Sequence, residues 1–272
     1  MDRTLTPPRE VDVVALLCRT SDRVPAGSSG AEALATTLAG RAGALARLIG
    51  SPGTARAAPW QDDLRDARGC LLDAGGVVDG ALETGRFPVL LSSDCSICVS
   101  TLPALVRRLP DVRVLWLDAH ADFNTPETTM SAFLGGMCLA GACGLWDTGY
   151  GAGLDPARVV MCGVRDVDVA ERPLLDAHGV ARVDGPSQLA GALAGHDVFV
   201  HLDLDVLDPA ELPGAAFPAP RGFSLEGLSA LLAEVAASAR IVGAEITSFT
   251  APQHAPRFAE ALAPLLPEEV RR

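Results

Sequence analysis

The stretch VLWLDAHADFNTPETTMS, residues 114–131, joins an apolar run to a dense group of residue types that bind metals. Residues 114–117 predict a buried strand, because a short apolar run is typical of a strand covered on both faces. Asp118, His120 and Asp122 follow this run directly. If the backbone stays extended there, the two-residue period of a strand places all three side chains on one face.

A second stretch, VFVHLDLDVLDP at residues 198–209, has the same arrangement. Asp203 and Asp205 share a face at the end of another apolar strand, and His201 lies on that face too. Acidic groups at the ends of buried strands repel one another and take up protons unless a cation lies between them. We therefore predict a pair of divalent ions bridged by carboxylates, which makes a hydrolytic site. Solvated loop carboxylates or helix caps remain the alternative, and His201 is more often a satisfied core residue than a proton shuttle.

Strand and helix patterns alternate along the whole chain. This alternation predicts one α/β domain over residues 1–272, with a mostly parallel central sheet covered by helices on both faces. Ser224 is the expected N-cap of the last of these helices. The predicted strands are 11–18, 87–91, 112–117, 159–164, 198–206 and 241–249, and the predicted helices are 31–49, 61–83, 96–109, 186–194 and 224–239.

The composition excludes several classes of function. The chain of 272 residues carries a formal charge of −12, which argues against nucleic acid or an anionic membrane surface as a partner. It contains no Lys, which excludes a Walker-type phosphate loop and a pyridoxal Schiff base. The seven Cys have no paired spacing, so we expect no disulfide framework and a reducing compartment. Without a signal peptide or a membrane-spanning run, the expected location is the cytoplasm.

The motifs DAHADFNTPETT (residues 118–129) and HLDLDVLDP (residues 201–209) resemble the metal signatures of the arginase (ureohydrolase) family. A third family signature, a Gly-Gly-Asp-His-Ser turn, falls on SSDCS at residues 92–96. The resemblance extends from about Glu32 to the C-terminal helix. It implies an arginase-like three-layer α-β-α sandwich, two Mn²⁺ ions and hydrolysis of C–N bonds in linear amidines.

The resemblance also implies six metal ligands. Cys95 stands where the family has a histidine, and the alternative that Cys95 is only a small buried residue stays open. A thiolate is a soft ligand that suits zinc or ferrous iron better than manganese, although the family implies manganese. Asp122 is also expected to accept a proton during the reaction. In the implied set, Asp118 and Asp203 bridge both ions, His120 and Asp205 complete one ion, and Asp122 and Cys95 complete the other.

The positions that recognise the amino-acid end of the substrate are retained. The resemblance places Asn124, Thr129 and Ser131 at the α-carboxylate. It places Asp168 and Glu171, from the stretch GVRDVDVAE, at the α-amino group. Capping of a loop is the alternative role for Asp168. Both halves together imply a guanidino amino acid as the small-molecule substrate rather than agmatine.

The positions around the reacting group are altered. The family's catalytic histidine falls on Gly135, its guanidinium-binding glutamate falls on Ser248, and a threonine falls on Phe217. A guanidinium stays protonated, so burying it without a carboxylate is unfavourable. An N-hydroxyguanidine is neutral near physiological pH and carries its own hydroxyl. We therefore expect hydrolysis of Nω-hydroxy-L-arginine to L-ornithine and hydroxyurea, with Ser248 among the substrate-binding residues.

Two other functions remain alternatives. One is ordinary L-arginine hydrolysis with a different proton relay, and the other is a catalytically inactive arginase-like protein that binds guanidino ligands. The resemblance further implies a role in the biosynthesis of an antibiotic, D-cycloserine. Family members are often trimers or hexamers, so a homo-oligomer is compatible with the sequence.

Overall fold

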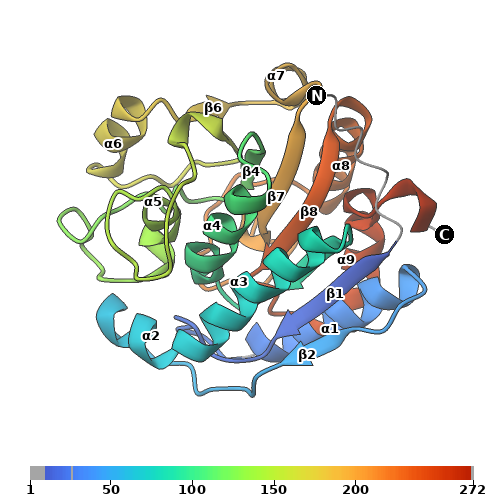
Figure 1. Ribbon diagram of the computed structural model, residues 1–272, viewed down its shortest axis with the longest axis horizontal. Coiled ribbons are helices and arrows are strands. Elements are labelled where there is room, and N and C mark those ends of the chain that lie inside the picture. Colours follow the sequence, from blue (N-terminus) through green and yellow to red (C-terminus); the bar gives the residue numbers. More distant parts are fainter. Residues whose placement is uncertain (1–9, 26, 271–272) are drawn as a thin grey trace.

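The computed structural model describes residues 10–25 and 27–270, and its centre is one eight-stranded sheet. The strand order is β2-β1-β3-β8-β7-β4-β5-β6, and every neighbouring pair is parallel, as expected from the alternation of strands and helices (Figure 1). The strands are β1 Val11–Leu16, β2 Arg47–Ile49, β3 Phe87–Leu91, β4 Arg113–Leu117, β5 Val159–Cys162, β6 Ala181–Val183, β7 Asp197–Asp203 and β8 Arg240–Thr247.

Helices cover both faces of this sheet and bury the alternating apolar side chains of its strands. One layer contains α1 Gly27–Arg41, α7 Pro186–Leu193, α8 Leu225–Ser238 and α9 Ala255–Ala261. The other contains α2 Trp60–Asp66, α3 Arg68–Glu83, α4 Cys98–Arg108, α5 Cys138–Ala142 and α6 Glu171–Ala177. This is the predicted three-layer α-β-α sandwich.

Several predicted boundaries are wrong. The helix expected over 31–49 ends at Arg41, and the chain then forms the short edge strand β2 beside β1. Three residues are too few for a period to be read from them. The helix expected over 61–83 is divided at Ala67 into α2 and α3. By contrast, Ser224 caps α8 as predicted, because its hydroxyl accepts the N–H of Gly227 at 3.0 Å.

One disulfide joins the end of β1 to α3, between Cys18 and Cys70. The cysteine spacing did not predict this bond, because the two residues are 52 positions apart and belong to no motif. Five cysteines are free, and among them Cys95, Cys98, Cys138 and Cys162 are buried.

The sheet aligns the ends of four adjacent strands, β3, β8, β7 and β4. Leu117 of β4 pairs with Leu202 of β7, so Asp118 and Asp203 follow side by side. Ile246 of β8 pairs with Leu91 of β3, which brings the turn after β3 to the same edge. Ligands bind in such sheets beyond the carboxyl ends of the strands, where the strand order reverses.

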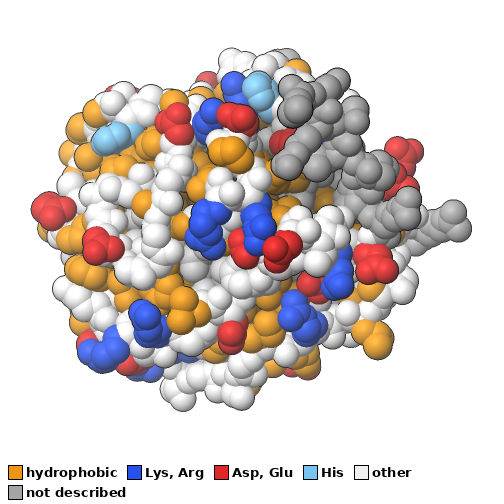
Figure 2. Space-filling view, viewed as in Figure 1, with side chains coloured by type: hydrophobic (Ala, Val, Ile, Leu, Met, Phe, Trp, Pro, Cys, Tyr) orange, Lys and Arg blue, Asp and Glu red, His pale blue; other side chains and the backbone are white. Residues whose placement is uncertain are grey.

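The surface agrees with the absence of a membrane-spanning pattern. In residues 10–25 and 27–270, no helix is long and apolar enough to cross a bilayer. On the face drawn in Figure 2, basic and acidic side chains are interspersed rather than collected into a broad basic patch.

Candidate metal centre

The two acidic motifs meet at the carboxyl ends of β4 and β7. The predicted extended backbone does not continue through either motif. Asp122 has a positive φ of 49°, and the side chain of Asp203 accepts the N–H of Asp205 at 2.7 Å, which begins a 3-10 turn over Leu204–Val206. These turns, rather than a period of two, bring the acidic side chains to one cavity.

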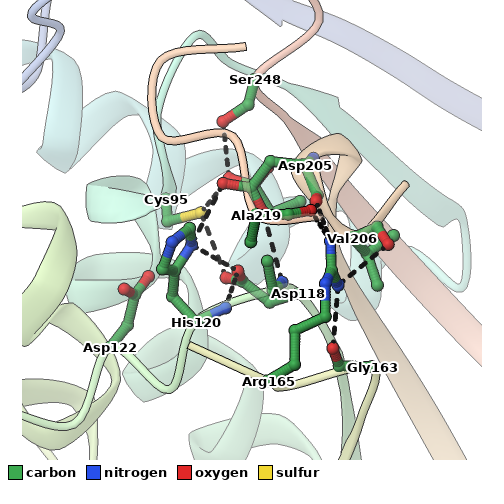
Figure 3. Close-up of polar contacts among 12 residues, drawn as sticks. Cys95, Asp118, His120, Asp122, Gly163, Arg165, Asp205, Val206, Ala219 and Ser248 are labelled. Atoms are coloured by element: carbon green, nitrogen blue, oxygen red, sulfur yellow. Dashed lines mark hydrogen bonds and ion pairs between the residues drawn. The ribbon is translucent and has the colours of Figure 1, made fainter. Parts of the chain in front are cut away.

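A first group of candidate metal ligands comprises Asp118, His120 and Asp205, whose ligand atoms lie within 4.8 Å of one another. His120 Nδ1 is 3.1 Å from Asp205 Oδ2 and 3.4 Å from Asp118 Oδ1. Asp205 Oδ1 also accepts the N–H of Ala119 at 3.2 Å, which ties the two motifs together. Figure 3 shows these three side chains facing one another.

A second group comprises Cys95, Asp118 and His201, again with ligand atoms within 4.8 Å. The Cys95 sulfur is 2.8 Å from Asp203 Oδ2, 3.2 Å from His201 Nε2 and 3.9 Å from Asp118 Oδ2. Cys95 begins a 3-10 turn after β3 that is capped by its neighbour Asp94, which accepts the N–H of Ser96 at 2.9 Å. The thiol is therefore fixed beside the carboxylates.

His201 is a fully buried core residue with a partner at each ring nitrogen. Its Nδ1 lies 2.7 Å from Glu245 Oε1, its Nε2 contacts the Cys95 sulfur, and its ring stacks on Trp116 at a centroid distance of 3.6 Å. Glu245 also accepts the hydroxyl of Thr101 at 2.6 Å. The expected satisfied core histidine therefore also orients the thiol. The sequence did not single out Glu245, because a lone carboxylate in a strand carries no motif.

The electrostatics of the cluster call for a cation. Burial and the neighbouring Asp118 raise the pKa of Asp205 to about 6. Burial raises the pKa of Cys95, Asp122 and Asp203 as well, and nearby carboxylates add to each shift. Burial alone would lower the pKa of His120, but hydrogen bonds to Asp118 and Asp205 outweigh it and raise this pKa to about 12. Divalent ions held by this set of oxygen, nitrogen and sulfur donors would relieve the repulsion, so the residues fit a metal centre.

Asp122, like Asp203, belongs to neither of the two candidate groups. Its carboxylate lines the same cavity but its Oδ2 lies 3.7 Å from the Cys138 sulfur. In Figure 3 its carboxylate stands beside His120, with no drawn contact to the other ligands.

The cavity in front of this centre has a volume of about 430 Å³, which suits a molecule the size of an amino acid. The carboxylates of the centre form its floor. Thr129 does not line it, because its hydroxyl instead accepts the N–H of Ala132 at 3.1 Å. The other predicted substrate-binding residues do line it: Asn124, Ser131, Asp168, Glu171 and Ser248.

Two of these residues form one polar corner. Asn124 Nδ2 donates to Asp168 Oδ2 at 3.0 Å. Glu171, the first residue of α6, accepts the backbone N–H groups of Phe123 and Asp168 at 2.8 Å each. Glu171 therefore holds the two loops together, while the exposed Asp168 carboxylate faces the cavity.

The wall of the cavity beside Gly135, where the resemblance leads us to expect a catalytic histidine, is apolar. A Cβ atom at Gly135 would lie 2.6 Å from Cε1 and Cζ of Phe133, so the Phe133 ring occupies the space of a side chain at that position. Phe217 packs against the Phe133 ring at 5.0 Å and approaches the ring of His120 edge-on at 6.2 Å. Ser248 donates its hydroxyl to Asp203 Oδ2 at 2.5 Å.

Arg165 is a structural residue that the sequence did not single out. Its side chain donates to a ring of backbone carbonyls around the turn that carries Asp205, as Figure 3 shows in part. Burial lowers the pKa of Arg165. The stretch GVRDVDVAE draws attention to its acidic residues, and the available signal for Arg165 is a basic residue in a chain segment close to Gly- and Pro-rich loops. The acceptors belong to Gly163, Asp205, Val206, Leu207, Ala219 and Pro220.

Comparison with known proteins places this geometry in one family. Residues 63–266 match the arginase family. The chain is 36% identical over 261 residues to the Nω-hydroxy-L-arginine amidinohydrolase of Streptomyces lavendulae, covering 94% of each chain. It is 33% identical over 184 residues to the arginase of Bacillus caldovelox, covering 61% of each chain. Its fold superimposes on the crystal structure of arginase from Bacillus cereus with a TM-score of 0.82 at 24% identity, covering 95% of this chain and 98% of the other. The chain therefore belongs to the arginase family and is an amidinohydrolase of that family.

Proposed function

We propose that this amidinohydrolase cleaves Nω-hydroxy-L-arginine to L-ornithine and hydroxyurea at a centre of two Mn²⁺ ions. The observation that carries the substrate choice is the Phe133 ring in the space beside Gly135. Gly135 has no side chain to relay a proton, and the Phe133 ring fills the space that a side chain at this position would need. The hydroxyl of an N-hydroxyguanidine would itself supply the missing polar group.

The second support is that position 248, where the resemblance leads us to expect a guanidinium-binding glutamate, carries no carboxylate. Ser248 stands where a carboxylate would be needed, and its hydroxyl is already engaged with Asp203. Phe217 and Phe133 form the adjoining apolar wall. A charged guanidinium buried there without a carboxylate would lose its hydration uncompensated, whereas a neutral hydroxyguanidine would not.

The ions, when bound, would supply Lewis acidity and an activated water. The side chains that would hold the ions are Cys95, Asp118, His120, Asp122, Asp203 and Asp205. Asp122 would also accept a proton, which suits a buried carboxylate whose pKa is raised by burial and by Asp118.

The amino-acid end of the substrate would lie in the polar corner. We assign the α-carboxylate to Asn124 and Ser131, which line the cavity together. We assign the α-amino group to Asp168, whose carboxylate is exposed beside Asn124. Glu171 would act by holding Asp168 rather than by touching the substrate. Supply of hydroxyurea to the biosynthesis of an antibiotic such as D-cycloserine is the role that fits these products.

Product analysis tests the proposal. The chain purified with manganese is incubated separately with Nω-hydroxy-L-arginine and L-arginine, and ornithine, hydroxyurea and urea are quantified. We expect a higher kcat/KM for hydroxyarginine, and a higher value for arginine would overturn the substrate choice. Asp205→Asn should abolish turnover, whereas Asp208→Asn, a neighbouring acid outside the cavity, should retain it. A chain that binds two ions yet turns over neither compound would instead be an inactive guanidino-binding relative.

A further inference from the structure

Arg23 is the one basic side chain other than His120 among the described residues that line the cavity. Its Nη2 donates to the backbone carbonyl of Ser131 at 3.3 Å, and its guanidinium carbon lies 4.5 Å from the centre of the Phe133 ring. Its Nε is buried without a hydrogen-bond partner. Among the described residues, no ion pair joins Arg23 to a carboxylate. An arginine with donors left over in a cavity is a site for an anion.

The loop that carries Arg23 is held rigidly. The carbonyl of Asp22 accepts both Arg19 Nε at 3.2 Å and the backbone N–H of Arg56 at 3.0 Å. The Phe133 ring supports the guanidinium face by a cation–π contact. A guanidinium fixed in this way loses little conformational entropy when it binds a ligand.

The position of Arg23 matches one end of the proposed substrate. Its contact with Ser131 places the guanidinium beside a residue assigned to the α-carboxylate. Asp168, which accepts a hydrogen bond from Asn124, lines the same cavity and carries the opposite charge. A cation and an anion that line one cavity complement the carboxylate and ammonium groups of a zwitterionic amino acid.

We propose that Arg23 binds the α-carboxylate of the substrate through charged hydrogen bonds and so selects amino acids over decarboxylated guanidines. The inference rests on the proposed function, because it assumes a guanidino amino acid in this cavity. In this proposal Arg23 binds the carboxylate and makes no contact with the bond that is cleaved. Its removal should therefore weaken substrate binding and leave the chemical step unchanged.

The test combines a protein variant with a change in the substrate. Arg23→Gln should lower kcat/KM for Nω-hydroxy-L-arginine on the order of 10- to 100-fold, the range for hydrogen bonds to a charged group, mainly through KM. For N-hydroxyagmatine, which lacks the carboxylate, it should change kcat/KM less than about twofold. Arg23→Lys, which keeps the charge, should show an intermediate loss. Arg68→Gln is the matched control, because Arg68 also lies over an aromatic ring, that of Tyr150, but outside the cavity.

Binding of L-ornithine and of putrescine, measured by calorimetry, separates this inference from the proposed function. Arg23→Gln should weaken L-ornithine binding and leave the binding of putrescine, which has no carboxylate, unchanged. Two results would overturn the role of Arg23. One is an equal loss for Nω-hydroxy-L-arginine and N-hydroxyagmatine in kcat/KM, or for L-ornithine and putrescine in affinity. The other is no loss for any of these compounds. If the chain turns over neither hydroxyguanidine, the proposed function fails, while the ornithine measurement still decides the role of Arg23.

Discussion

Replacement of Arg19 by Met is expected to destabilise the protein strongly. Arg19 Nη1 lies 2.7 Å from Asp63 Oδ1, and the side chains are 5% and 0% exposed. Among the described residues, Asp63 Oδ2 has no hydrogen-bond partner, so Arg19 provides the one hydrogen bond that this part of the chain offers to the carboxylate. Removing one member of a buried ion pair costs about 3–5 kcal/mol. The lower end applies here, because burial already raises the pKa of Asp63 and protonation can relieve part of the loss.

The assay is urea unfolding of the wild type and three variants. With about 3 kcal/mol lost, the melting temperature should also fall by about 6–12 °C, at roughly 2–4 °C for each kcal/mol in a domain near this size. Arg56→Met is the matched control, because Arg56 pairs with Asp66 nearby but both side chains are over 40% exposed, and such pairs contribute at most about 1 kcal/mol. The double variant Arg19→Met/Asp63→Leu should recover most of the loss. An Arg19→Met loss no larger than that of Arg56→Met would refute the reasoning.

Three further outcomes are expected. Adding Mn²⁺ to chelator-treated protein should raise the melting temperature, since saturation to 100 times the dissociation constant contributes about 2.7 kcal/mol per site; an unchanged melting curve would count against a metal centre. Without metal, the pKa of Asp22 and of Asp205 is about 6 against an ordinary 3.8, so the folded form binds more protons than the unfolded form between these values. Their stabilising contribution is complete below about pH 4 and is lost as the pH rises through about 6, and urea unfolding in chelator at both ends of this range checks the sign. Gly135→His alone should lower the free energy of unfolding by about 1–3 kcal/mol, because its side chain would overpack against Phe133. The double variant Gly135→His/Phe133→Ala should recover at least half of this loss, as measured by urea unfolding. Equal stability of the two variants would contradict the idea that the two side chains compete for one space.

The parts of the fold that follow from local pattern were predictable. Apolar runs before Asp118 and Asp203 indicated buried strands, and the structure contains β4 and β7 there. Because parallel strands end at one edge, the meeting of the two acidic motifs was predictable as well. The family resemblance supplied the three-layer sandwich with a mostly parallel sheet, and the fold confirms it, but the order of the strands was not predicted.

Features that depend on distant contacts were not predictable from local pattern. The sulfur of Cys95 meets His201, which lies 106 positions away, and Cys18 meets Cys70. The Phe133 ring in the space beside Gly135 is a matter of side-chain packing. A hydrophobic period reports which face is buried but not which residue lies opposite it.

The strand order also has a consequence for how the protein is made. Strand β7 lies between β4, which is synthesised well before it, and β8, which is synthesised after it. A chain still emerging from the ribosome at β6 already carries Cys95, Asp118 and His120 but lacks Asp203 and Asp205. The full set of proposed ligands is therefore present only once the chain has been synthesised through Asp205. An ion bound earlier would meet an incomplete set of donors, so loading of the proposed centre would follow synthesis of β7 and the turn after it.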